Sequence, residues 1–213
     1  MTTKQRYDGV IAWFSEHMPV AESELHYSDP YQLLVAVILS AQCTDKRVNM
    51  TTPALFEAFP TPYHMARATA EEIYPYIRSI SYPNNKARNL AGMARMLCEE
   101  FGGEVPSDLE QMQRLPGVGR KSANLIMGDV FGKPAIVTDT HCIRLVNRIG
   151  LVDGIKDPKK VEMALWKIIP PEEGSALCHR FVCHGRDVCT ARTTPHCERC
   201  CLADVCKANA KAH

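Results

Sequence analysis

The segment that most restricts what this chain can fold into is LPGVGRKSAN, residues 115–124. A proline followed by two glycines with one valine between them favours a very tight turn, because glycine accepts backbone angles that other residues avoid. One helix ends before the turn at Arg114, and a second helix begins after it at about Arg120. The sequence therefore predicts two helices joined by a short Leu-Pro-Gly-Val-Gly turn, a helix-hairpin-helix.

The predicted turn offers backbone groups to a ligand. Gly117 and Gly119 can take positive φ and let another molecule approach closely, and the following helix points its free N–H groups at the turn. Such amides form an anion site that suits a phosphate of a nucleic-acid backbone, with Val118 and Arg120 as further contacts. Contacts of this kind position a protein on DNA without reading its sequence. The alternative is a tight helical hairpin that binds nothing.

Lys121 lies in the first turn of the predicted second helix. The helix dipole is positive there and Arg120 is adjacent, so both disfavour the charged form of the Lys121 amine. An amine that readily loses its proton can attack a carbon atom and form a Schiff base. A lysine that binds phosphate is the competing interpretation.

The segment IVTDTHCIR, residues 136–144, adds a carboxylate and an imidazole. Asp139 alone would cap a helix, and His141 alone would be a hydrogen-bonded histidine. Together with Lys121, the Asp139 carboxylate could orient or deprotonate the amine, or stabilise positive charge that develops on a sugar. The pair of Lys121 and Asp139 is more informative than either residue.

Helical periodicity runs through most of the chain. Apolar residues recur at intervals of three and four from Asn85 to Phe101, which predicts an amphipathic helix with Lys86 and Arg88 off its apolar stripe. Residues 31–44 are apolar on all sides and predict a central buried helix. Further helices are predicted at 107–114, opened by a Ser107–Glu110 capping box; from Thr138 or Asp139 to Gly150; and at 161–169, closed by Pro170 and Pro171. No strand pairs are predicted, so the fold class is all-α.

Length, hydropathy and charge set the remaining limits. A chain of 213 residues suffices for one domain or two small ones. The longest apolar run, 33–39, is far too short to cross a bilayer, and the N-terminus lacks the apolar segment of a signal peptide. We therefore expect a cytoplasmic protein with no membrane partner. The net charge is +1, but residues 179–213 carry six Lys and Arg against three Asp and Glu, a mildly basic tail that suits a polyanion.

Seven of the ten cysteines fall between residues 178 and 206. In a compartment that keeps thiols reduced, this clustering favours a metal site over disulfides. Cys189, Cys197, Cys200 and Cys206 have the spacing C-x7-C-x2-C-x5-C. Thiolates at these spacings suit zinc or an iron–sulfur cluster, and spacing does not decide between the two. Cys201, beside Cys200, is an alternative ligand.

The ordered combination of LPGVGRKSAN, VTDTH, HGRDVC and the C-terminal cysteines resembles the endonuclease III family, the bifunctional DNA glycosylases and apurinic/apyrimidinic lyases of the helix-hairpin-helix superfamily. The resemblance runs from about residue 30 to Cys206 and covers most of the chain. It implies that Lys121 attacks C1′ of an oxidised pyrimidine nucleotide flipped out of damaged double-stranded DNA, and that Asp139 assists base departure and proton transfer. β-Elimination from the Schiff base would then cut the strand 3′ to the lesion.

The resemblance also implies an architecture and a cofactor. Members of the family have two α-helical lobes, which here would be a six-helix domain at about 22–134 and a cluster domain made of 1–21 and 135–213. The cysteines at 189, 197, 200 and 206 would bind a [4Fe-4S] cluster. We expect a monomer that acts on bacterial, nucleoid-associated DNA.

Further DNA contacts follow from the resemblance, together with three departures from the family pattern. Gln42, in LSAQCTD, matches the residue that fills the gap left by the extruded base, and His141 and Tyr82 are candidate contacts. The first cysteine gap is one residue longer than in the family. Ser81 and Tyr82 replace a glycine and an apolar wedge, and CHR at 178–180 replaces His-His-Trp. Tyr82 could still stack against exposed bases.

Two other hypotheses belong to different functional classes. A non-enzymatic DNA-binding module would use the hairpin for phosphate alone and would need no Lys121 together with Asp139. A zinc-stabilised helical protein unrelated to DNA would leave the hairpin, the lysine and the aspartate without a shared purpose. Among the glycosylases, the adenine-mismatch branch lacks a lysine at this place, so Lys121 favours the lyase branch.

Overall fold

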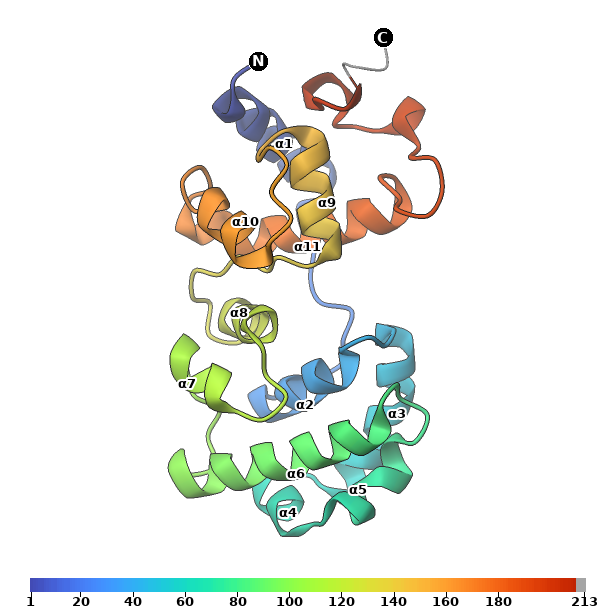
Figure 1. Ribbon diagram of the computed structural model, residues 1–213, viewed down its shortest axis with the longest axis vertical. Coiled ribbons are helices and arrows are strands. Elements are labelled where there is room, and N and C mark those ends of the chain that lie inside the picture. Colours follow the sequence, from blue (N-terminus) through green and yellow to red (C-terminus); the bar gives the residue numbers. More distant parts are fainter. Residues whose placement is uncertain (210–213) are drawn as a thin grey trace. The chain divides into compact units, whose positions relative to one another are not determined.

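The computed structural model describes residues 1–209, and no strand occurs among them, which confirms the predicted all-α class (Figure 1). The chain divides into two compact units, Ser23–Phe131 and Met1–Glu22 together with the chain from Gly132 onward. The assignment of a hairpin domain and a cluster domain stays a prediction, and residues 210–213 of the predicted cluster domain lie outside the described part. No helix within residues 1–209 combines the length and apolar character that a membrane span requires.

The unit Ser23–Phe131 contains helices that pack around the long helix α6 (Figure 1). They are α2 (Pro30–Ser40), α3 (Asp45–Ala58), α4 (Pro62–Arg67), α5 (Ala70–Ile77), α6 (Pro83–Glu100), α7 (Leu109–Arg114) and α8 (Arg120–Asp129). Helices α2, α4 and α5 all contact α6, and α8 contacts both α2 and α7. This packing places the hairpin formed by α7 and α8 against the same core that buries α2.

Helix α2 is the buried centre of this unit. Asp29 caps its first turn by accepting a hydrogen bond from the Gln32 amide at 2.8 Å, and every side chain from 33 to 39 is buried. Each large apolar side chain buried this way contributes roughly 1.5–3 kcal/mol. The predicted end at residue 44 is wrong, because the chain turns after Ser40: the Cys43 amide donates to the Ser40 carbonyl at 3.0 Å.

Helix α6 confirms the predicted amphipathic pattern and corrects one of its members. Leu90, Met93 and Leu97 are buried, as their spacing requires. Arg88 is exposed as predicted, but the Lys86 side chain is only 5% exposed. Lys86 is buried because its ammonium donates hydrogen bonds to backbone carbonyls of the same unit. Periodicity alone cannot show such partners.

Two predicted helix starts differ from the structure. Helix α7 begins at Leu109 with Asp108 as its cap, which accepts from the Gln111 amide at 2.9 Å, so the Ser107–Glu110 capping box is wrong. Helix α10 spans Pro158–Leu165 rather than 161–169, because Asp157 caps it and Pro158 occupies its first position. In both cases the cap is the aspartate directly before the helix, Asp108 or Asp157, and not a residue at the predicted start.

The other unit is built from helix α1 (Thr3–His17), helix α9 (Thr140–Ile149), α10, helix α11 (Gly174–Asp187) and three short 3-10 turns, η1 (Pro171–Glu173), η2 (Cys197–Arg199) and η3 (Ala203–Val205). Helix α9 packs along α11, and α1 contacts η3. Phe14 of α1 and Phe181 of α11 are fully buried and meet edge to face, with ring centroids 5.9 Å apart. Gly150, in the left-handed conformation, ends α9 as predicted.

Candidate functional site

The predicted helix-hairpin-helix is present in the unit Ser23–Phe131. Helix α7 ends at Arg114, α8 begins at Arg120, and the Val118 amide donates to the Leu115 carbonyl at 3.0 Å to close the turn. Gly117 has φ +83, and a Cβ atom at this position would lie 3.0 Å from Asn89. Glycine is therefore required at 117 both for backbone angle and for space.

Gly119 differs from the expectation of positive φ. Its φ is −88 and its ψ is 173, an extended conformation open to any residue, and no atom lies within 4 Å of where its Cβ would be. It is the N-cap of α8 and provides no side chain to satisfy the first amides of the helix. The helix start therefore has no side-chain cap, which suits an anion site. The Val118 side chain is 6% exposed, so only its backbone is available to a ligand.

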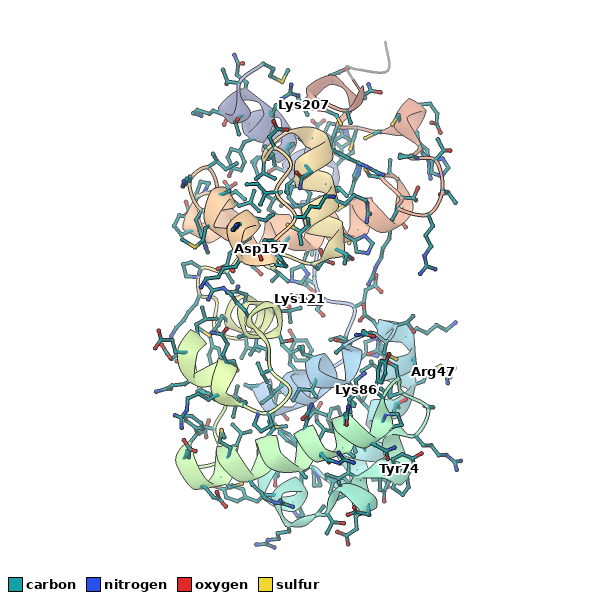
Figure 2. The ribbon with its side chains drawn as sticks, in the orientation of Figure 1. Arg47, Tyr74, Lys86, Lys121, Asp157 and Lys207 are labelled. Atoms are coloured by element: carbon teal, nitrogen blue, oxygen red, sulfur yellow. The ribbon has the colours of Figure 1, made fainter. Side chains whose placement is uncertain are left out.

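Lys121 occupies the second position of α8 and its side chain is exposed (Figure 2). Within the part of the chain that the structure describes, the Lys121 amine has neither a hydrogen-bond acceptor nor an ion-pair partner. Arg120, the preceding residue, is half-buried. The hairpin thus presents a lysine amine at the open, uncapped start of a helix.

Asp139 belongs to the other unit, where it is the N-cap of α9. Its Oδ1 accepts a hydrogen bond from the Cys142 amide at 2.7 Å, so the capping role weighed for this residue is confirmed. Among residues 1–209, no donor is assigned to the second carboxylate oxygen, Oδ2. Capping of α9 therefore leaves one oxygen of Asp139 available for chemistry.

His141, in the first turn of α9, is half-buried against α11. The Arg144 guanidinium bridges the two helices: its Nη2 lies 3.1 Å from the His141 Nδ1 and donates to the Gly185 carbonyl at 2.9 Å. A Cβ on Gly185 would lie 2.7 Å from the His141 Nδ1, so this glycine permits the contact. Burial lowers the pKa of His141, and the neighbouring Arg144 and Arg186 add to that effect, although Asp139 opposes it. A DNA contact by His141 stays a prediction.

Gln42 and Tyr82 lie on two loops that the structure joins. Gln42 follows α2 and Tyr82 precedes α6, and the Ser81 hydroxyl donates to the Gln42 carbonyl at 2.7 Å. Both have positive φ, 54 for Gln42 and 55 for Tyr82, and no other non-glycine residue in the described part of the chain does. Gln42 is exposed and Tyr82 is 63% exposed. The two predicted contact residues are thus neighbours with unusual backbone conformations.

The four cysteines predicted as ligands line one cavity in the unit that contains α9. The cavity has a volume of about 270 Å³, and its lining includes Cys189, Cys197, Cys200, Cys206 and Arg148. Burial raises the pKa of the Cys197 thiol, and the nearby Cys200, Cys189 and Cys206 raise it further. Four thiols that share one cavity fit a cationic group that binds thiolates.

A second set of possible ligands overlaps the first at Cys200. The sulfur atoms of Cys200 and Cys201 and a ring nitrogen of His184 lie within 4.8 Å of one another. Hydrogen bonds from Cys201 and His184 lower the pKa of Cys200 to about 4 although burial opposes the shift, whereas the pKa of Cys201 is raised by its contact with Cys200. Cys201 does not line the cavity, so we favour the set that contains Cys200 and three further cavity cysteines.

Helix α9 connects Asp139 to this cavity. Arg148, near its last turn, donates to the Cys189 sulfur at 3.2 Å and to the Thr190 carbonyl at 2.9 Å. The Cys206 thiol donates to the Arg148 carbonyl at 3.4 Å. One helix thus begins at the predicted catalytic carboxylate and ends against two of the predicted metal ligands.

Sequence reasoning missed two residues of this arrangement, Lys86 and Gly185. Lys86 is a cation in an early turn of α6, where the helix dipole favours an acid. Lys121 is likewise a cation near a helix start and is selected for that reason. The sequence therefore carries the same signal at Lys86. Gly185 lies in the HGR segment, but a glycine inside a helix gives no sign of which partner it admits.

Comparison with known proteins identifies the family. The chain matches the HhH-GPD superfamily of base excision DNA repair proteins over residues 35–171. The endonuclease III of Synechocystis sp. is 44% identical over 204 residues, covering 95% of this chain and 92% of that relative. The endonuclease III of Bacillus subtilis is 41% identical over 193 residues, covering 91% of this chain and 88% of that relative.

A solved structure has the same fold. It is a trapped endonuclease III–DNA covalent intermediate, which matches with a TM-score of 0.93 at 42% identity and covers 100% of this chain and 99% of that chain. The match extends over nearly the whole of both chains, so it includes the segments that carry the sequence motifs as well as the fold. The chain therefore belongs to the endonuclease III family of the HhH-GPD superfamily, the DNA glycosylases of base excision repair.

Proposed function

We propose that this glycosylase is bifunctional and cuts DNA at the damaged site through a Schiff base on Lys121. The observation that carries the proposal is the exposed Lys121 amine, without an assigned partner in residues 1–209, at the uncapped start of α8. The amides of that helix start and of the Gly117–Gly119 turn would bind a backbone phosphate. A similar protein has been trapped as a covalent intermediate with DNA, which supports a covalent mechanism.

The proposed reaction has two stages. The neutral Lys121 amine attacks C1′ of a flipped-out oxidised pyrimidine nucleotide, and the bond from C1′ to the base breaks, with the electron pair leaving on the base. The sugar ring opens to give the imine. Loss of a C2′ proton then expels the 3′ phosphate and cuts the strand, and water releases the lysine from the imine.

Asp139 is the proposed partner in the proton transfers. Its Oδ2 would accept the proton that Lys121 loses and would stabilise positive charge developing on the sugar. Its Oδ1 is held by the Cys142 amide, so the carboxylate is already oriented before DNA binds. Preorganised carboxylates of this kind avoid reorganisation during the reaction.

We further propose that Cys189, Cys197, Cys200 and Cys206 hold a [4Fe-4S] cluster. The four cysteines in the lining of one cavity and its volume of about 270 Å³ support this assignment. The cluster would supply a structural cross-link for the C-terminal loop and no catalytic step.

The substrate would be damaged chromosomal DNA in the cytoplasm, and the enzyme would bind it as a monomer. Gln42 and Tyr82 would lie at the gap left by the extruded base.

Borohydride trapping tests the proposed nucleophile. Purified holoenzyme is incubated with a duplex that contains one abasic site, with Lys121→Ala alongside, and binding of both proteins to the duplex is measured separately. We expect a stable adduct with the wild type alone and similar binding by both. An adduct formed by Lys121→Ala would show that Lys121 is not the nucleophile. Binding by the wild type without an adduct would show that the enzyme is a monofunctional glycosylase.

A further inference from the structure

The loop that carries Gln42 is a turn held in an unfavourable conformation. Ala41 has φ −56 and ψ 115, Gln42 has φ 54, and the Cys43 amide donates to the Ser40 carbonyl at 3.0 Å. These values describe a type II turn, whose third residue is normally glycine or asparagine because it needs positive φ. A glutamine at that position is strained, and such strain persists only where the surroundings hold it.

The loop that carries Tyr82 has the same property. Tyr82 has φ 55 and ψ 50, in the left-handed region, and no side chain caps the helix that it precedes. Its side chain is 63% exposed, and its backbone has a conformation that tyrosine disfavours. Two exposed residues on adjacent loops thus depend on outside contacts for their backbone geometry.

Lys86 supplies those contacts. Its ammonium donates to the Leu39 carbonyl at 2.8 Å and to the Ala41 carbonyl at 2.6 Å, and it lies 3.4 Å from the Ser81 hydroxyl. The Ser81 hydroxyl in turn donates to the Gln42 carbonyl at 2.7 Å. One buried cation therefore connects the end of α2, the Gln42 turn and the Tyr82 loop.

The position of this cation has an electrostatic reason. The carbonyls in the last turn of α2 have no partner within the helix and carry the negative end of its dipole, so a cation is favourable there. Burial lowers the pKa of the Lys86 ammonium, and Cys43 partly offsets this. Hydrogen bonds to two carbonyls and one hydroxyl offset the cost of burying the ammonium, which supplies three donors.

We propose that Lys86 is a positioning residue for base extrusion: it fixes the Gln42 and Tyr82 loops as one rigid unit, so that both side chains enter the damaged duplex together. The inference rests on the proposed contacts of Gln42 and Tyr82 with DNA. Because the two loops are ordered before DNA binds, little conformational entropy is lost when the side chains insert.

The two activities proposed for the enzyme should depend on Lys86 to different extents. A damaged base that is still stacked and paired must be extruded against that stacking, whereas an abasic site has no base to extrude. Loss of Lys86 should therefore slow base excision much more than strand cleavage at an abasic site. A general loss of folded protein would lower both rates by the same factor.

The experiment compares Lys86→Met with Arg88→Met, an exposed residue two positions further along α6. Single-turnover rates of the holoenzymes are measured on one duplex with thymine glycol and on another with an abasic site. We expect Lys86→Met to lower the excision rate at least tenfold more than the abasic cleavage rate, and Arg88→Met to leave the ratio of the two rates unchanged. Equal losses on the two duplexes, or no loss on either, would overturn the proposal.

A second measurement does not require catalysis. Fluorescence of a 2-aminopurine beside the lesion reports unstacking, and it is recorded with Lys121→Ala and with Lys121→Ala/Lys86→Met. We expect the double variant to bind the duplex but to unstack it less, and equal unstacking by the two would contradict the role of Lys86. An inactive wild type that still unstacks DNA would refute only the proposed chemistry. Should Lys86→Met fail to fold, Ser81→Ala removes the bond to Gln42 and should give the same selective loss, to a smaller degree.

Discussion

The Nε2 atom of His184 lies 3.4 Å from the sulfur of Cys200, while the Nδ1 atom of the same ring lies 3.8 Å from the sulfur of Cys201. The ring is 3% exposed and packs edge to face on Phe14, with centroids 5.8 Å apart, so it cannot turn freely between the two. His184 therefore contacts both of two adjacent cysteines, whose sulfur atoms lie within 4.8 Å of one another. Cys200 lines the cavity with the other proposed ligands, whereas Cys201 is not part of the lining.

This arrangement predicts opposite outcomes for two neighbouring serine substitutions. Cys200→Ser should lose the iron and the visible absorbance of the proposed cluster, because a hydroxyl is a poor ligand for iron. Cys201→Ser should retain both, because Cys201 is not part of the cavity lining. Iron content per protein and the visible spectrum of protein purified without oxygen provide the check. Iron loss in Cys201→Ser with retention in Cys200→Ser would reverse the assignment.

Asp139→Asn separates the two roles of this residue. Asparagine caps helices about as well as aspartate, so the bond to the Cys142 amide and the thermal stability should be retained. The carboxylate charge is lost, and turnover should fall by about two to four orders of magnitude if Asp139 moves protons in the reaction. Single-turnover excision and the melting temperature are measured on the same preparation. Unchanged turnover would leave Asp139 as a helix cap alone.

The two hairpin glycines should respond differently to substitution. Gly117→Ala places a side chain at φ +83 and 3.0 Å from Asn89, so we expect a loss of about 1–3 kcal/mol in stability. Gly119→Ser adds a preferred cap at an extended position with free space, so stability should stay the same or rise by a few tenths of a kcal/mol. Its hydroxymethyl group nevertheless obstructs the open amides, and DNA affinity should fall. Thermal unfolding measures the change in stability, and fluorescence anisotropy with a labelled duplex measures the change in affinity. Unchanged affinity in Gly119→Ser would show that no phosphate binds at this helix start.

The hairpin could be predicted because its signals are local. A turn of Pro116, Gly117 and Gly119 between two periodic segments needs no information from elsewhere, and the structure ends α7 at Arg114 and starts α8 at Arg120 as predicted. The all-α class follows from the same periodicity. Cap assignment was less secure, because Ser107 and Asp108 are both good caps and tertiary packing decides between them.

The burial of Lys86 and its carbonyl partners could not be predicted from pattern alone. The carbonyls that bind Lys86 lie 47 and 45 positions away in the sequence, so its burial depends on how α2 ends beside α6. The conformation of Gly119 is open in the sequence for a related reason: glycine permits positive φ but does not require it, and here the cap of α8 has an extended conformation. The cavity that unites the four cysteines likewise depends on contacts of the C-terminal loop with α9.

His141 predicts how stability changes with pH. Its pKa is lowered in the folded protein, chiefly by burial, from an unfolded value of about 6.5. Between the two values the unfolded chain binds more protons than the folded chain, so stability falls as the pH drops below about 6.5 and the loss is complete below the folded pKa. At neutral pH the ring is uncharged, so a contact with DNA phosphate would be a neutral hydrogen bond.

Replacement of His141 by glutamine should reduce this pH dependence, because glutamine can still accept a hydrogen bond from Arg144 but does not titrate. The apparent melting temperatures of the wild type and His141→Gln are measured at one heating rate from pH 7.5 to pH 5. Carboxylates titrate in both proteins, so the difference between the two curves isolates the histidine. We expect the wild type to lose more stability than the variant as the pH falls, and parallel curves would show that His141 is as easily protonated in the folded protein as in the unfolded chain.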